Sequence, residues 1–149
     1  MRQHRRAGAA PGESVEPTRL SSLTQWWPKT LGRSEARGAE VVGAIEAGGG
    51  EAEFVRADLE APDDVRALAE RAAEVDILVN NAGVFPVGAT HELSEATFDE
   101  TFAVNVKAPF LLTAAIAPKM VARGGSTIIN VTTMAAEFGM PGLSAYGAS

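Results

Sequence analysis

The stretch from residue 75 to residue 83, Val-Asp-Ile-Leu-Val-Asn-Asn-Ala-Gly, constrains the fold more than any other part of this chain. Its first half is mainly β-branched and apolar, which predicts a strand buried on both faces, as in parallel sheets. Ligands of open α/β sheets bind outside the carboxyl ends of such strands. Two amides and a glycine fall at that end here and offer polar groups and an approachable backbone. An ordinary Asn/Gly turn explains the same residues equally well.

Composition sets the outer limits. The 149 residues are 46% hydrophobic, enough for one domain with a core. The formal net charge is −6 and both signs are scattered, so we expect no nucleic-acid partner and no membrane partner. The absence of cysteine excludes disulfides, thiolate zinc sites and a cysteine nucleophile, and it is compatible with a cytoplasmic location. His4 and His91 are the only histidines, so no metal site is expected.

The first part of the chain differs in character from the rest. Prolines at positions 11, 17 and 28 interrupt every window in which a periodic pattern could develop. The basic start lacks the apolar segment of a secretory signal, although a transit peptide is an alternative. We therefore expect residues 1–29 to be a disordered or non-homologous segment and residues 30–149 to form the folded domain.

From Thr30 onward, strand and helix patterns alternate with short joints. Strands are expected at 30–33, 51–57, 75–79 and 126–132, and helices at 34–47, 62–72, 94–122 and 144–149. Ser34 and Ser94 are suitable N-caps, and Pro109 requires an irregularity near Asn105. The helices carry apolar stripes at Val41, Val42 and Ile45, at Val65, Leu68, Ala69 and Ala72, and at Phe102, Val106, Phe110, Leu111 and Ile116. This alternation predicts an α/β fold with a doubly wound parallel sheet in three α/β/α layers.

Four motifs in order and spacing resemble the short-chain dehydrogenase/reductase family. They are Asn80-Asn81-Ala82-Gly83, Ala-Val-Asn105-Val-Lys-Ala-Pro-Phe, Ile-Ile-Asn-Val-Thr-Thr133, and Pro-Gly-Leu-Ser-Ala-Tyr146-Gly-Ala-Ser. The resemblance implies a Rossmann-like domain that transfers a hydride between NADP or NAD and a small-molecule alcohol or ketone. The same four motifs disfavour a flavodoxin-like binding module.

The resemblance also implies the catalytic residues. Tyr146 matches the tyrosine that protonates a carbonyl oxygen during hydride addition. Thr133 matches a position usually held by serine; it keeps the hydroxyl donor but adds a methyl group that crowds the pocket. Asn105 matches an asparagine that holds a water molecule in the proton relay. Alternatively, Asn105 is an amide that bonds the local backbone at a helix kink.

The cofactor residues implied by the resemblance surround the strand ends. Asp58, with Leu59 beside it, matches an acid that accepts from the adenine amino group, and the adenosine side is completed by Asn81, Ala82 and Gly83. Arg33 lies where an arginine accommodates the 2′-phosphate of NADP, whereas an acid would favour NAD. The alternatives are a solvent-facing aspartate at a strand end and an exposed arginine at a helix start.

Two family features are absent from the sequence. One is the opening strand with its Thr-Gly-x-x-x-Gly-x-Gly turn, which would lie between the strands at 51–57 and 75–79. The other is a lysine four residues after Tyr146. Gly48-Gly49-Gly50 follows a helix and is not a phosphate loop. We therefore expect either an impaired NAD(P)-dependent oxidoreductase or a non-catalytic, truncated remnant with at most an interaction role. In both cases exposed strand edges favour homo-oligomers.

Overall fold

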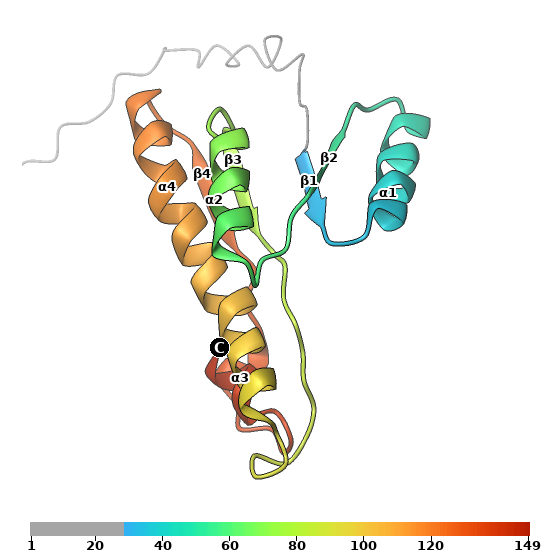
Figure 1. Ribbon diagram of the computed structural model, residues 1–149. Coiled ribbons are helices and arrows are strands. Elements are labelled where there is room, and N and C mark those ends of the chain that lie inside the picture. Colours follow the sequence, from blue (N-terminus) through green and yellow to red (C-terminus); the bar gives the residue numbers. More distant parts are fainter. Residues whose placement is uncertain (1–28) are drawn as a thin grey trace, which may run out of the picture.

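The computed structural model describes residues 29–149 and contains two small parallel sheets flanked by helices (Figure 1). The expected disorder of residues 1–29 concerns a segment outside this range, apart from Lys29, which is the first residue of a strand. The strands are β1 (Lys29–Gly32), β2 (Glu53–Arg56), β3 (Ile77–Asn80) and β4 (Thr127–Asn130). The helices are α1 (Glu35–Ala47), α2 (Pro62–Arg71), α3 (Glu95–Phe102), the π-helical turn η2 (Ala103–Lys107), α4 (Ala108–Ala122), the 3₁₀ turn η3 (Met134–Ala136) and α5 (Ser144–Ala148).

Local signals place most helix ends where the sequence predicts them. The Ser34 and Ser94 hydroxyls accept hydrogen bonds from the third residue of α1 and of α3, respectively. Pro62 opens α2 at a position where the missing N–H costs nothing. The irregularity expected near Asn105 is the π-helical turn η2, which ends directly before α4 and its Pro109.

The strands form two separate parallel ladders. Leu31 pairs with Val55 in the β1–β2 ladder, and Leu78 pairs with Ile128 in the β3–β4 ladder. The parallel arrangement that the sequence predicts is therefore confirmed for the strands at 75–79 and 126–132, which are neighbours. No strand among residues 29–149 joins the two ladders. The expected position of the gap, between the strands at 51–57 and 75–79, is wrong. The gap lies between β1 and β3, because β1 pairs with β2 and residues of β1 and β3 line one cavity.

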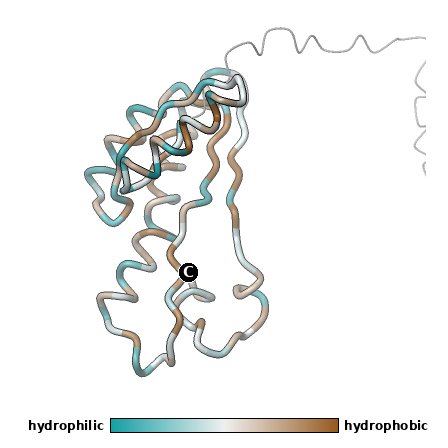
Figure 2. Tube along the Cα trace, turned by 90° about the vertical axis from the view of Figure 1, so that its right-hand side faces the viewer, coloured by the Kyte–Doolittle hydropathy of each residue, from teal (hydrophilic) through white to brown (hydrophobic). Residues whose placement is uncertain are grey.

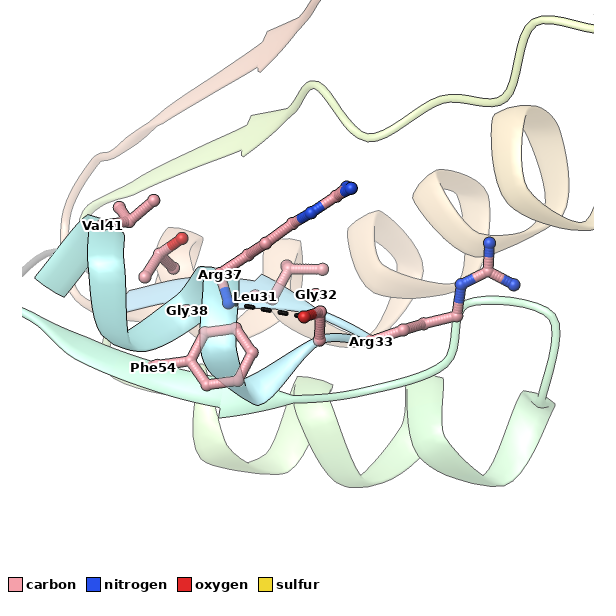
Figure 3. A pocket seen from close by; sticks show the side chains of 9 residues that line it. Leu31, Gly32, Arg33, Arg37, Gly38, Val41 and Phe54 are labelled. Atoms are coloured by element: carbon pink, nitrogen blue, oxygen red, sulfur yellow. Dashed lines mark hydrogen bonds between the residues drawn. The ribbon is translucent and has the colours of Figure 1, made fainter.

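Helices cover both faces of the β1–β2 ladder. Neighbouring residues of a strand point to opposite faces. In β2 the Phe54 ring lies against Gly38 of α1, while Val55 is buried in a core shared with α2 and α4. Figure 3 shows this arrangement, with β1 and β2 between α1 and α2. The three-layer α/β/α architecture is thus present, although the sheet is in two parts.

The buried face of the long helix differs from the predicted stripe. Val106 and Phe110 are exposed, whereas the buried residues recur every four positions at Val104, Ala108, Leu112, Ile116 and Met120. The helix is apolar on all sides, and the π-helical turn rotates its faces, so periodicity alone identified Ile116 correctly but not Val106 and Phe110. By length and composition alone, residues 95–122 form a helix that could cross a membrane; core helices of soluble proteins meet the same criterion, and 28% of the most apolar window of this helix is buried.

Strand β3 is half-buried rather than buried on both faces, and Val79 is 50% exposed. The Asp76 and Asn80 carbonyl oxygens accept hydrogen bonds from the N–H groups of Thr127 and Val131, at the two ends of β4. Because successive residues of a strand direct their backbone groups to opposite sides, those of Ile77 and Val79 point away from β4. They face a cavity of about 70 Å³ that we call the central slot, lined by apolar residues including Leu31, Val55, Leu68, Ile77, Leu78 and Ile116. β3 begins with three consecutive apolar residues and β4 contains two, whereas the helices alternate between hydrophobic and hydrophilic residues (Figure 2).

Gly38 and Gly43 provide a matched test of helix packing. A Cβ atom at Gly38 would overlap the Phe54 ring, whereas nothing lies within 4 Å of one at Gly43. We expect Gly38→Ala to lower the free energy of unfolding by about 1–3 kcal/mol. Gly43→Ala should raise it by about 0.5–1 kcal/mol through helix propensity. Urea unfolding measures both, and adding Phe54→Leu should rescue Gly38→Ala. Equal effects at the two glycines would contradict this packing.

The open edges predict self-association. Unpaired strand edges recruit other chains, and a whole domain has a net stability of only about 5–15 kcal/mol. Analytical ultracentrifugation should therefore show mass increasing with protein concentration. A monomer with a cooperative, concentration-independent thermal transition would exclude this expectation.

Candidate functional site

Two loops meet beyond the carboxyl ends of β3 and β4. The Gly88 N–H donates to the Gly142 carbonyl oxygen at 2.9 Å, and the Thr90 hydroxyl bonds the Ser144 hydroxyl at 2.9 Å. Gly142 has a positive φ of 81°, which favours glycine at this contact. The loop after β3 is thereby fixed to the segment that leads into α5.

Tyr146 lies in the first turn of α5 with a half-buried side chain. Its ring makes an edge-to-face contact with Phe85, with centroids 4.7 Å apart and an interplanar angle of 90°. Within residues 29–149 its hydroxyl makes no hydrogen bond. The Phe85 contact therefore orients the ring and leaves the hydroxyl available to a ligand.

Thr133 follows β4 and caps η3. Its Oγ1 accepts from the Ala135 N–H at 3.2 Å, so the hydroxyl proton remains available for donation. Turn η3 packs against α5, and a Cβ atom at Gly147 would lie only 2.7 Å from the Ala135 carbonyl oxygen. Glycine at position 147 thus permits a close approach between the elements that carry Thr133 and Tyr146.

Asn105 connects three parts of the site from the π-helical turn. Its Oδ1 accepts from the Val84 N–H at 2.9 Å, and its Nδ2 donates to the Val84 carbonyl oxygen at 3.0 Å and to the Ser149 hydroxyl at 2.9 Å. These partners lie 21 and 44 positions away in the sequence, so they are not the local helix backbone of the alternative, and the role of Asn105 stays a prediction. The contacts tie the loop after β3 to the end of α5.

The residues expected around adenosine are spread over two strand ends. Asp58 and Leu59 are half-buried after β2, and the Asp58 carboxylate accepts from the Glu60 N–H at 3.0 Å. Asn81, Ala82 and Gly83 are exposed after β3. The central slot separates the two sheets that carry these groups.

Arg33 lies at the edge of an open pocket of about 360 Å³ between α1, β1 and β2 (Figure 3). Its guanidinium pairs with the Glu60 carboxylate at 2.8 Å and lies 3.9 Å from the Glu100 carboxylate. Arg37 lines the same pocket and has no ion pair within residues 29–149. An anion at this pocket must therefore compete with Glu60 for Arg33.

Sequence reasoning missed several residues at this end of the molecule. Phe85 contacts Tyr146, Ser149 contacts Asn105, and Glu60 and Glu100 lie against Arg33. An aromatic residue two positions after the Asn-Asn-Ala-Gly motif is the only one of these that the sequence could have suggested. The ion pairs depend on packing between distant elements.

Comparisons with known proteins match most of the described chain. Residues 29–149 match a family model described as short chain dehydrogenase. An uncharacterized oxidoreductase of Thermotoga maritima is 43% identical over 118 residues, covering 78% of this chain and 47% of that protein. The chain therefore spans about half the length of this curated relative.

Two solved structures share the fold. A short chain dehydrogenase/reductase family protein is 46% identical with a TM-score of 0.75, over 80% of this chain and 50% of the other. A metagenomic short-chain oxidoreductase in complex with NADP is 37% identical with a TM-score of 0.76, over 80% of this chain and 57% of the other.

The Asn105 contacts predict a local change in backbone protection. Asn105→Leu removes the acceptor of the Val84 N–H, so that amide should exchange with solvent at least about tenfold faster, as expected for loss of about 1.4 kcal/mol or more. The exposed Asn81 gives a matched control, and Asn81→Leu should leave Val84 unchanged. Amide exchange by NMR measures both, with Leu112 as the core reference. Unchanged Val84 exchange in Asn105→Leu would contradict the assigned contacts.

Proposed function

The chain belongs to the short-chain dehydrogenase family, and from this premise we propose that it is an NAD(P)-dependent oxidoreductase by descent whose activity is impaired as the chain stands. The observation that carries the proposal is the close packing of η3 on α5, which brings the elements bearing Thr133 and Tyr146 together beyond β4. The reaction class is hydride transfer between a nicotinamide cofactor and a small-molecule alcohol or ketone. The absence of cysteine and the net charge of −6 support a cytoplasmic location and no nucleic-acid partner.

We propose distinct roles for three side chains. The Tyr146 hydroxyl protonates the carbonyl oxygen during reduction, and the Thr133 hydroxyl donates a hydrogen bond to the same oxygen. Asn105 holds the loop after β3 against α5 through its bonds to Val84 and Ser149. The cofactor, when bound, supplies the hydride.

The adenosine end of NADP fits the residues present. Asp58 and Leu59 offer a carboxylate and an apolar contact, and Arg33 and Arg37 offer guanidinium groups beside the open pocket. Arg33 favours NADP over NAD, because a 2′-phosphate can replace Glu60 as its partner. The NADP complex of the metagenomic relative supports this preference.

The pyrophosphate does not fit the residues present. It requires a ring of backbone N–H groups at a helix N-terminus. Among residues 29–149, the turn into α1 contains a single glycine, and the Ser34 side chain already accepts from the Arg37 N–H at the N-terminus of this helix. The Asp58 N–H donates to Asp64 of α2 at 2.9 Å, so that strand end is also occupied. Without a pyrophosphate site in the described part of the chain, residues 29–149 do not hold the nicotinamide beside the substrate carbonyl, and the rate gain from positioning is lost.

A non-catalytic role in protein interaction is the second candidate function. The open edges of β1 and β3 favour it, because each edge can pair with an extended segment of another chain. The two candidates share the family and differ in whether nicotinamide chemistry takes place.

Titration with NADPH followed by fluorescence tests the proposal. We expect no saturation at micromolar NADPH and no Tyr146-dependent NADPH oxidation with a panel of ketones and aldehydes. A chimera carrying the N- and C-terminal segments of the Thermotoga maritima relative should gain NADPH binding and Tyr146-dependent NADPH oxidation. In that chimera, Arg33→Ala should weaken NADPH binding about tenfold or more, since a charge-assisted bond contributes on the order of 1.5–3 kcal/mol. The exposed Arg66→Ala is the control.

The proposal that activity is impaired would be refuted if the unmodified chain bound NADPH at micromolar concentration. It would also be refuted if the unmodified chain showed turnover that Tyr146→Phe abolished. A chimera that binds NADPH but stays inactive would implicate Thr133. A chimera that binds no nicotinamide cofactor would contradict descent from an active oxidoreductase and favour the interaction role.

A further inference from the structure

Large apolar side chains are unusually exposed on the two loops that meet near Tyr146. We call Phe85, Val87, Met134, Phe138 and Met140 the apolar rim; their exposed fractions are 58%, 67%, 75%, 63% and 52%. Exposed apolar side chains also occur elsewhere, for example at Phe110 and Val121; what distinguishes the rim is that its members lie on the two loops that are joined beside Tyr146.

Specific contacts hold the two halves of the rim together. Phe85 is fixed against the Tyr146 ring, and Val87 lies 3.6 Å from a Cβ position at Gly142, two residues after Met140. The hydrogen bond between Gly88 and Gly142 fixes the register of the two loops. Met134 directly follows Thr133, and Phe85 contacts the Tyr146 ring, so each half of the rim adjoins one of the two hydroxyl-bearing residues of the proposed site.

The rim is also nearly free of charge. Residues 83–90 contain no charged side chain, and residues 131–149 contain only Glu137. No lysine or arginine on these loops can pair with a carboxylate or phosphate. An anionic substrate would lose its hydration there without gaining an ionic partner, whereas an apolar one gains contact area.

We propose that the apolar rim selects uncharged carbonyl or alcohol substrates with a large apolar substituent, with Phe85 as a specificity-determining residue. This inference rests on the proposed function for the roles of Tyr146 and Thr133. The Phe85 ring holds Tyr146 by its edge-to-face contact and presents apolar surface to the substrate beside the reacting hydroxyl. The substrate's oxygen lies at the two hydroxyls and its apolar substituent lies along the rim.

Ligand binding without cofactor tests this inference separately from the proposed function. The probes are acetophenone and 2-octanone, with acetone and pyruvate as small and anionic comparisons. In ¹⁵N-labelled full chain, acetophenone and 2-octanone should shift the amide signals of Phe85, Gly142 and Tyr146. Acetone and pyruvate should shift them at least tenfold less at equal concentration.

Variants locate the binding surface. Phe85→Ser and Phe138→Ser should each weaken acetophenone binding at least threefold. Val121→Ser is the matched control, because Val121 is 77% exposed at the end of α4 that lies far from α5 (Figure 1). Both rim residues are exposed, so their substitution should spare the fold, as the unchanged amide signals of the core residue Ile116 will verify.

Three outcomes would overturn the inference. Pyruvate shifting the same signals as strongly as acetophenone would exclude selection for uncharged substrates. Unchanged acetophenone affinity in both serine variants would exclude the rim. Rim signals that move with protein concentration alone, and that acetophenone does not shift, would show that a second copy covers the rim. The two proposals can also fail separately. If acetophenone binds the rim of the unmodified chain but the chimera binds no NADPH, the proposed function is refuted and the apolar binding surface is retained.

Discussion

Within the described residues 29–149, the structure depends on the one-sided pairing of its two central strands. In a parallel ladder, alternate residues of a strand direct their backbone groups to opposite neighbours. β1 uses one side for β2, and β3 uses one side for β4. The backbone groups of β1 and β3 that are not used in these ladders face the central slot, where apolar residues of α2 and α4 form the wall. Helix packing between α2 and α4, rather than a continuous sheet, therefore holds the two ladders in one molecule.

This division of the sheet separates the two halves of the proposed site. The β3–β4 half carries its own supports, since Asn105 bonds Val84 and Ser149 and Phe85 holds the Tyr146 ring. The β1–β2 half carries Arg33 and Asp58, whose polar groups already bond to neighbouring residues. Groups that transfer a proton can thus be arranged locally, whereas a dinucleotide must be held across both halves. The proposal of an impaired oxidoreductase rests on that difference.

Local chemistry made much of the fold predictable. The caps at Ser34 and Ser94, the proline that opens α2 and the π-helical turn at Asn105 follow from backbone geometry within a few residues. The buried face of α4 could not be predicted, because an all-round apolar helix has no polar side to orient it. The partners of Arg33 were likewise hidden, since Glu60 and Glu100 approach it only through the packing of distant elements. The proposed roles of Tyr146, Thr133 and Asn105 remain predictions from the motif pattern.

Amide hydrogen exchange within β3 tests the central claim most directly. Leu78 and Asn80 direct their backbone groups to β4, whereas Ile77 and Val79 direct theirs to the central slot. The account predicts that the Leu78 and Asn80 amides are protected and that those of Ile77 and Val79 exchange much faster under conditions where the chain is monomeric. Equal protection at all four positions in the monomer would show that β3 is paired on both sides, and would contradict a sheet divided between β1 and β3.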